Sequence, residues 1–503
     1  MKTLLSKLKR NLPENKHVWK SFTMTALPVV FSVFLFALNS FVDNFMSINI
    51  TGGNQALSYA NAWTEIEIGI IASTTIIGTA LFSQYVGKRD WYKVKEIINI
   101  RILFNIGISL IFAIPCIIAT KQMIELISGF DNAMSDNIKN QAIEYLRMIV
   151  VSWILNAISF TLAMILREKN HGSVTVFTSI ITLAINITLN SIFIYNLNLG
   201  IVYLAYSTLI SIFVSIIFML LWTWIKDRTI FCNLLKIFVI SSHIAKQFFK
   251  RFGSFILFAI GSIFVNIRFI FWNAGYGTGT IGESVLRISA ATILGITGMF
   301  FNIFWTTFES MSATIAVYVG TKLGINDIER AKINAKQLQG FHLIMGIVIA
   351  LCALIIAFTV PYMNFLTGGY EKELQNFYSN NPIPDGYTLN QIISNGKKIF
   401  LQNIKYTLIG ISVFIPMFVW FVSRARIIAI GGLTNISAAT ETIIEALHIG
   451  FLAIQCYLWN TKVSFSWAYF IFFAVEIVKL ISYEIVYKNV NWARNITHLK
   501  TID

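Results

Sequence analysis

Long apolar runs recur along the whole chain, and short polar segments separate them. Runs of about 20 apolar residues match the length at which an α-helix crosses a bilayer. They are continuous, unlike the alternating segments of about ten residues that are typical of a membrane β-barrel. The pattern predicts an all-α polytopic membrane protein with about twelve transmembrane helices. The expected spans lie near residues 24–48, 56–86, 98–120, 141–166, 173–195, 200–225, 252–273, 285–320, 339–366, 399–423, 432–459 and 463–487.

The polar segments divide this series into parts. We expect a cytoplasmic N-terminal segment (1–20), a six-helix N-lobe (21–228), a cytoplasmic linker (229–251), a six-helix C-lobe (252–487) and a cytoplasmic tail (488–503). The basic, partly amphipathic stretch from Lys226 to Lys250 predicts a surface helix between the lobes. The polar stretch from Thr367 to Lys398 contains Pro382, Pro384 and Gly386 and predicts a flexible external loop.

An internal repeat supports the two-lobe division. The second span ends at Gly87 and the eighth at Gly324, and a short charged turn follows each glycine. With six spans in each half, both halves have the same orientation, so the repeat is parallel. Two pseudo-symmetric six-helix bundles are typical of transporters that rock about a central cavity.

Composition and charge agree with a membrane protein. Of the 503 residues, 56% are hydrophobic and 13% are charged, which excludes a soluble globular protein. The net charge of +15 is explained by membrane topology, because most Lys and Arg fall in alternate loops. We therefore expect both termini in the cytoplasm, a multi-pass protein of the plasma membrane, and no nucleic-acid partner.

The first span carries an acid, Asp43, far along an apolar helix. A carboxylate in the bilayer costs about 3 kcal/mol on insertion scales, so it usually faces a cavity and has a function. Asn39 lies one helical turn earlier and shares its face. The alternative is that Asp43 ends the helix and lies in water.

Two asparagines of the fifth span, Asn186 and Asn190, are also one turn apart, at a depth compatible with Asp43. We expect them to be hydrogen-bond partners of Asp43. The alternative is a purely structural contact between helices, worth about 1 kcal/mol each.

The second half has its own acids at mid-membrane depth, Glu309, Glu441 and Glu445. Glu441, Glu445 and His448 form one stripe of a helix. The acids suit a Na+ or H+ site or the binding of a cationic substrate. The alternative is structural ion pairing with Arg268 or Lys405.

Other charged residues in the spans are expected to serve no transport role. Glu65 and Glu67 are predicted to line the outer mouth, and Arg268 to extend to the outer surface as a structural residue. The four cysteines have no metal-ligand spacing and are predicted to be packing residues.

Several segments, in order and spacing, resemble the MATE (multidrug and toxic compound extrusion) transporters. The resemblance covers both halves, with a looser fit in the last two spans. It rests on Ala26-Leu27-Pro28, Val42-Asp43-Asn44, Gly52-Gly53, Ala56, Ser83-Gln84-Tyr85-Val86-Gly87, Arg167, Gly172, Asn186, Asn190, Gly200, Ala205, Ser211, Gly320, Gly324, Asp327, Glu329, Arg330 and Ala331.

The resemblance implies a two-lobed exporter that exchanges H+ or Na+ for organic, often cationic, drugs. It also implies that Asp43 works with Asn186 and with a residue four positions later. The proton-coupled branch of the family has an acid at that later position, whereas this chain has Asn190. A site with two carboxylates is therefore in doubt.

The function hypothesis is a cation-coupled antiporter of drugs or organic cations that works by alternating access. The substrate is expected to be small, cationic and lipophilic, and the protein a monomer in the bilayer. No cofactor is expected besides the coupling ion, H+ or Na+, and no metal site other than a Na+ site at Asp43 or at Glu441 and Glu445.

Two rival functions stay open. One is a flippase for a lipid or lipid-linked saccharide on a related two-lobed fold, which the basic inner loops would suit. The other is a membrane enzyme, but the sequence shows no catalytic constellation, Walker loop or metal-spaced His/Cys set, so we expect no enzymatic activity.

Overall fold

The computed structural model describes residues 11–47, 50, 53–127 and 136–497. Within these ranges the chain is helical and contains no β-strand, so the predicted all-α class is confirmed. Ten of the described helices are long and apolar enough to cross a membrane.

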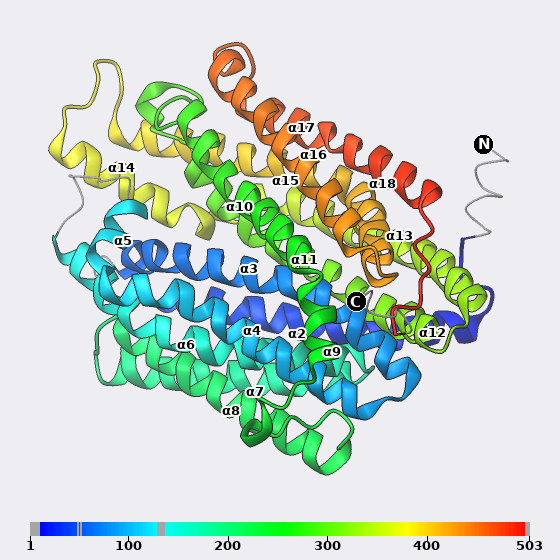
Figure 1. Cartoon of the computed structure of the whole chain (residues 1–503). Helices are drawn as coiled ribbons and strands as arrows, with labels where there is room; N and C mark the ends of the chain where they lie inside the picture. The colour runs from blue at the N-terminus through cyan, green and yellow to red at the C-terminus, as the bar shows by residue number, and fades with distance from the viewer. Residues whose placement is uncertain (1–10, 48–49, 51–52, 128–135, 498–503) are drawn as a thin grey trace.

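The first half of the chain forms one layer of helices, the first bundle, drawn from blue to green in Figure 1. α7 continues directly into a π-helical segment, Ser191–Asn196. The helices are α2 (Lys16–Ser47), α3 (Gly53–Lys88), α4 (Trp91–Ile118), α5 (Thr120–Ile127), α6 (Asp136–Glu168), α7 (Gly172–Asn190) and α8 (Val202–Lys226).

The second half forms the second bundle, which lies against the first (Figure 1). α11 and α16 continue into π-helical segments, Ala316–Gly320 and Gln455–Trp459. The helices are α10 (Phe252–Gly275), α11 (Ala290–Ile315), α12 (Thr321–Gly324), α13 (Ile328–Thr359), α14 (Gly368–Asn380), α15 (Leu389–Ile430), α16 (Thr434–Ile454), α17 (Phe465–Val475) and α18 (Ile477–Asn489).

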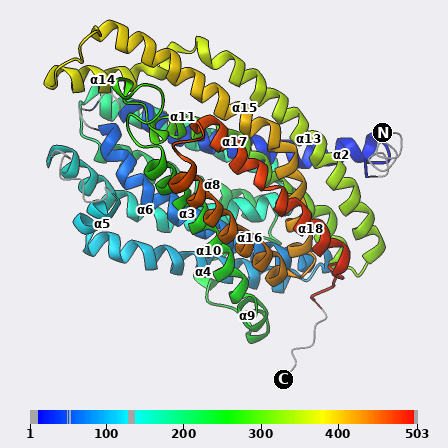
Figure 2. The ribbon, with the colours of Figure 1, turned by 90° about the horizontal axis from the view of Figure 1, so that it is seen from above.

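The twelve expected spans all have a helical counterpart. The eighth is α11 with its continuation through α12, and it begins at Ala290, a few residues later than expected. The twelfth is divided into α17 and α18 at Glu476, a buried acid. These two helices follow one another between α15 and α16 (Figure 2).

The two long polar segments have different outcomes. The helix expected between Lys226 and Lys250 forms, but it is short, α9 (Ser242–Phe249), and follows a single 3-10 turn. The prediction of a flexible loop from Thr367 to Lys398 is wrong, because α14 and the start of α15 occupy most of this segment. α14 is anchored by Tyr370, whose hydroxyl donates to the Leu286 carbonyl at 2.5 Å, and by Tyr378, which donates to the Val285 carbonyl at 2.7 Å.

The repeat seen in the sequence has the same local structure in both halves. Arg89 lies directly before Asp90, and Asn326 lies directly before Asp327. Both have left-handed φ angles, of 61° and 64°. Asp90 and Asp327 then cap the following helices, with side chains that accept from the third backbone N–H at 3.3 and 3.2 Å. Such a cap satisfies one of the free N–H groups of a helix start.

The repeated segments also touch one another across the two bundles. A Cβ atom on Gly87 would overlap the Thr321 carbonyl, and one on Gly324 would overlap the Gln84 carbonyl. These reciprocal contacts need glycine, because the two backbones approach too closely for any side chain. They close the molecule at the end where α3 and α12 finish, which we call the basic end.

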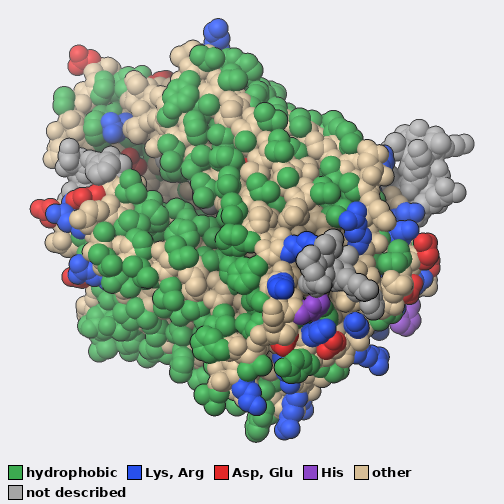
Figure 3. Space-filling view, in the orientation of Figure 1, with side chains coloured by type: hydrophobic (Ala, Val, Ile, Leu, Met, Phe, Trp, Pro, Cys, Tyr) green, Lys and Arg blue, Asp and Glu red, His purple; other side chains and the backbone are tan. Residues whose placement is uncertain are grey.

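The C-terminal segment reinforces the same contact. Gln84 donates to the carbonyls of Ile430 and Arg494 at 3.2 and 3.0 Å, and its own side-chain oxygen accepts from the Ile496 N–H at 2.8 Å. Lys and Arg side chains gather at this end, whereas the surface is hollowed between the bundles toward the opposite end, near α14 (Figure 3). In this structure the bundles are thus joined at the basic end.

Candidate coupling site

Asp43 lies inside the first bundle, at the meeting of α2, α7 and α8. It is 6% exposed, so the alternative of a solvated helix end is wrong. Asn190 donates from Nδ2 to Asp43 Oδ1 at 2.6 Å, and the Thr208 hydroxyl lies 3.2 Å from Asp43 Oδ2. Asn190 also donates to Asn186 Oδ1 at 2.9 Å, and Asn186 donates to Thr208 at 3.3 Å. The four side chains form a closed hydrogen-bonded circuit, the Asp43 ring.

The ring offers neutral partners to a group that can carry a charge. Thr208 has one hydroxyl hydrogen and two acceptors in reach, Asp43 and the Leu204 carbonyl, which lies at 3.0 Å. When Asp43 is ionised, Thr208 can donate to it. When Asp43 is protonated, it can donate to Thr208, which then turns to Leu204. The ring therefore accommodates Asp43 with or without a proton.

Two further oxygens lie in the same region. The side-chain oxygens of Asn39 and Asn190 are buried and have no hydrogen-bond partner among the described residues. Asn39 thus lies on the expected face but makes none of the ring's bonds. A π-helical segment begins directly after Asn190, and such segments are frequent at functional sites. Carboxylate and amide oxygens are hard ligands suited to a small cation.

The acids of the second bundle have different partners. Glu445 pairs with both Arg268 and Lys479, and Glu476 lies 3.5 Å from Arg268. Glu441 lies 3.3 Å from Lys479 and accepts from the Tyr483 hydroxyl at 2.8 Å. We call Arg268, Glu441, Glu445, His448, Glu476 and Lys479 the charge cluster. Its carboxylates already face cations, so they do not fit the Na+ site expected at Glu441 and Glu445.

Histidine 448 completes the cluster in its neutral form. Its Nε2 faces the Phe472 carbonyl at 2.9 Å and must therefore donate, while its Nδ1 accepts from Arg268 at 3.3 Å. Arg268 is held inside the bundle, so its expected extension to the outer surface is wrong. Of the two expected pairing cations, Lys405 takes no part, because its ammonium lies over the Phe358 ring at 4.9 Å.

The remaining acids are separate from both groups. Glu309 on α11 is half-buried and interacts electrostatically with Arg167 of the first bundle, away from Glu441 and Glu445. Glu65 is exposed, but Glu67 is fully buried, so its expected place at the outer mouth is wrong.

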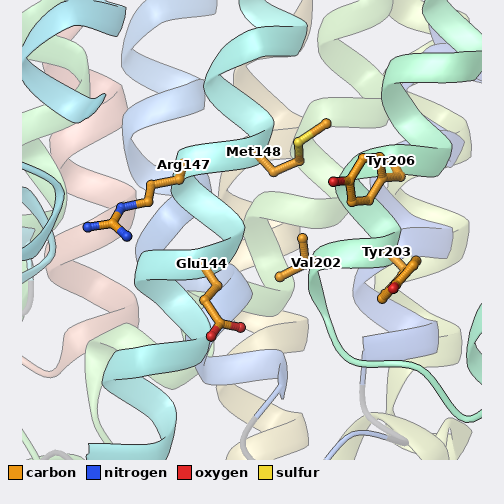
Figure 4. Close-up of a pocket in the computed structure, with 6 residues that line it drawn as sticks. All are labelled: Glu144, Arg147, Met148, Val202, Tyr203 and Tyr206. Atoms are coloured by element: carbon orange, nitrogen blue, oxygen red, sulfur yellow. The ribbon is translucent and has the colours of Figure 1, made fainter. Parts of the chain in front are cut away.

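A surface groove of about 470 Å³ lies between α6 and α8 (Figure 4). It belongs to a different face of α8 from the one that carries Thr208, since Tyr203 and Tyr206 line it. Its lining residues are Glu144, Arg147, Met148, Val202, Tyr203 and Tyr206. None of them is part of the Asp43 ring.

Sequence reasoning missed three residues of these sites. Glu476 and Lys479 are charged residues within an apolar run, which is itself a signal of a buried partner. Thr208 gave little signal, because a threonine is common in membrane helices. Within the described part of the chain, no group of three or more His, Cys, Asp or Glu side chains is arranged to hold a metal ion.

Comparison with known proteins bears on these sites. Residues 28–192 match the MatE family model, and this range includes Asp43, Asn186 and Asn190. The sequence matches none of the curated proteins with which it was compared.

Solved structures share the fold over nearly the whole chain. A MOP superfamily transporter from Pyrococcus furiosus has a TM-score of 0.70 at 16% identity, over 93% of this chain and 96% of that one. A MATE transporter from Vibrio cholerae has a TM-score of 0.69 at 14% identity, over 98% and 100%. The eukaryotic MATE transporter AtDTX14 has a TM-score of 0.70 at 12% identity, over 97% of each chain.

At these identities the structures establish the fold, and the family model adds the sequence relationship in the first bundle. Together they show a MatE domain match over residues 28–192 and, for nearly the whole chain, the multi-pass fold of solved MATE and MOP superfamily transporters.

Proposed function

We propose that the protein is a secondary active exporter that couples H+ or Na+ entry to the export of drugs or other organic cations. The observation that carries the proposal is the Asp43 ring. It holds one carboxylate among neutral amide and hydroxyl groups, which can bind and release a cation without breaking an ion pair.

In the proposed cycle the two lobes, 21–228 and 252–487, move as units about the linker 229–251. The joined basic end and the hollow near α14 support one state of alternating access (Figure 3). The basic end would face the cytoplasm of a plasma-membrane protein, with both termini inside, because positive charge favours that side. The coupling ion must bind one state more tightly than the other to drive transport.

The substrate is proposed to be a small lipophilic cation, bound by a monomer. The solved structures with the same fold include a multidrug resistance MATE transporter and complexes of MATE with MaL6 and with Br-NRF. For this chain, the exposed acid Glu65 of α3 would favour a cation.

The test is export of a lipophilic cationic dye from proteoliposomes under an imposed pH gradient and then under a Na+ gradient. Wild type is compared with Asp43→Asn, which keeps the shape of the side chain and removes its charge. We expect one gradient to drive dye movement in wild type and the variant to fall to the level of empty liposomes. The effective gradient identifies the ion.

Two results would contradict the proposal. One is gradient-driven export that survives in Asp43→Asn. The other is failure of both gradients to move dye while a fluorescent lipid is flipped, which would favour the lipid flippase.

A further inference from the structure

Three levels of polar contacts run through the interior of the first bundle, between α3, α4 and α6. On α4 they involve Ser109, Asn105 and Arg101, which are four residues apart and therefore share one face. Each of these residues meets a polar side chain of α3 or α6. We call this arrangement the polar ladder.

Two levels of the ladder are well paired. At the middle level Thr74 donates to Asn105 Oδ1 at 2.6 Å, and Asn105 donates to Thr161 at 2.8 Å. At the level nearest the basic end, Arg101 donates two hydrogen bonds to Glu168, at 2.7 and 3.0 Å, and Thr79 donates a third at 2.5 Å. Glu168 is therefore an ionised, structural carboxylate with a bidentate cation.

The third level contains Glu67, and it is incomplete. The Glu67 side chain is 0% exposed. Its Oε1 accepts from Ser109 at 2.5 Å, but its Oε2 is buried without any hydrogen-bond partner among the described residues. The apolar residues around this level are Ile70, Ile71, Ile108 and Ala157.

No cation among the described residues is paired with Glu67. The charged side chains inside the membrane on helices that pack against α3 have other partners. Arg101 of α4 binds Glu168 of α6, Arg147 of α6 donates to Thr120, and Arg167 of α6 donates to Ser32. Arg268 of α10 binds Glu445, Arg424 of α15 binds Glu484, Lys405 of α15 lies over Phe358, and Asp43 of α2 belongs to its ring. A buried carboxyl with no cation and with one oxygen that lacks any hydrogen-bond partner is more stable when it carries a proton.

The neighbours of Glu67 fit a proton that comes and goes. Ser109 has one hydroxyl hydrogen and two acceptors, Glu67 Oε1 and the Trp153 carbonyl, which lies at 3.5 Å. A protonated Glu67 can donate to Ser109, which then donates to Trp153. This is the arrangement found at Asp43, where Thr208 stands between the acid and the Leu204 carbonyl.

The level of Glu67 also borders the interface between the two bundles. Phe255 and Ala259 of α10, in the second bundle, pack against the apolar cluster formed by Ile70, Ile71 and Ile108. A rocking motion of one bundle on the other would change this cover and admit water to the carboxyl.

We propose that Glu67 is a second proton-binding site of the first bundle, so that each transport cycle carries a proton at Glu67 in addition to the ion at Asp43. The inference rests on the proposed ion-coupled transport for its role in the cycle. Proton binding at Glu67 itself does not depend on that function.

The first experiment measures the proton directly, by infrared spectroscopy of purified protein at neutral pH. Wild type is expected to show C=O absorption from protonated carboxyls, and Glu67→Gln to lose the component that comes from Glu67, both measured on an Asp43→Asn background so that Asp43 does not contribute. Glu168→Gln is the matched control, and it should retain the band because Glu168 is ionised in wild type. An unchanged band in Glu67→Gln would overturn the proposal.

If Glu67→Gln does not fold, Ser109→Ala answers the same question. It removes the hydroxyl that bonds to the carboxyl, so the band should move to the frequency of a less hydrogen-bonded group. A band that stays in place would show that it does not come from Glu67.

The second experiment counts protons per substrate, from the pH gradient that just balances an opposing substrate gradient in proteoliposomes. Glu67→Gln is expected to continue transport with one proton fewer in each cycle, whereas Asp43→Asn stops it. An unchanged proton count would overturn the role in transport. If wild type is not ion-coupled at all, the proposed function fails, but the infrared band still decides proton binding at Glu67.

Discussion

The two bundles place polar side chains on corresponding helices, but the buried acid has neutral partners in the first bundle and charged partners in the second. In the first bundle the first, fifth and sixth spans bring together one acid, two amides and a hydroxyl, at Asp43, Asn186, Asn190 and Thr208. In the second bundle the equivalent spans, α10, α16 and α17–α18, bring together the charge cluster. There a cation, Arg268, stands on the helix that corresponds to the one with Asp43.

The difference shows that the partners of an acid, rather than its depth, decide what it can do. Glu445 faces two cations, and neutralising it would remove from both the carboxylate that they share in a low-dielectric interior. Asp43 faces neutral groups that can bond to either of its protonation states. We therefore interpret the charge cluster as a structural support for α10, α16 and α18, and the Asp43 ring as the site of ion exchange.

The largest expected effect comes from breaking the charge cluster. Lys479→Met should leave Glu441 without a cation and Glu445 with Arg268 alone, and lower the free energy of unfolding by about 3–5 kcal/mol. The measurement is thermal unfolding in detergent. The double variant Lys479→Met with Glu445→Gln should recover part of the loss, because one of the excess negative charges is gone.

A stable Lys479→Met protein that loses ion dependence would reverse the comparison. The cluster would then be the coupling site.

A smaller effect is expected from changing the neutral partner of Asp43. Thr208→Val removes one hydrogen bond to the carboxylate, worth about 1 kcal/mol, and should shift the ion concentration for half-maximal transport about fivefold. For H+ the shift is downward, because the bond stabilises the ionised carboxyl. Thr208→Ser keeps the hydroxyl and should behave like wild type. Transport assays across a series of ion concentrations provide the measurement, and equal curves for Val and Ser would count against the role of Thr208.

The smallest effect concerns an ion pair outside the membrane spans, which adds a third case to the comparison. Asp227 lies 2.7 Å from Lys169 Nζ and 3.0 Å from His171 Nε2. Burial alone would raise the pKa of Asp227, but hydrogen bonds from Lys169, Thr229 and His171 outweigh it and lower the pKa from 3.8 to about 2. This stabilisation is present above about pH 4 and is lost as the pH falls toward about 2.

Asp227→Asn should therefore lower the free energy of unfolding by about 1 kcal/mol at neutral pH, since solvent screens the pair. Thermal unfolding of both proteins at several pH values measures the effect, and the two curves should converge in acid. A difference that does not change with pH would show that the charge of Asp227 contributes nothing.

The sequence by itself determined the helices, their order and much of the Asp43 ring. Apolar runs of membrane-spanning length can form only helices, because the bilayer offers no partner for a free backbone N–H or C=O. The contact between Asn186 and Asn190 could be predicted because residues four apart share a helix face. Their depth in the membrane, compatible with that of Asp43, then predicted that both residues bond to Asp43, and the resemblance to MATE transporters supported Asn186.

Only the tertiary structure decided which charges meet and how deeply they are buried. Glu67 and Glu65 are two residues apart, yet one is fully buried and the other exposed, because the rotation of α3 within the bundle points them in different directions. The pairing of Lys479 with Glu445 joins residues from different helices, and no local pattern specifies that contact. Polarity along the chain is a local property, but the partner of a buried charge is set by the way the helices pack.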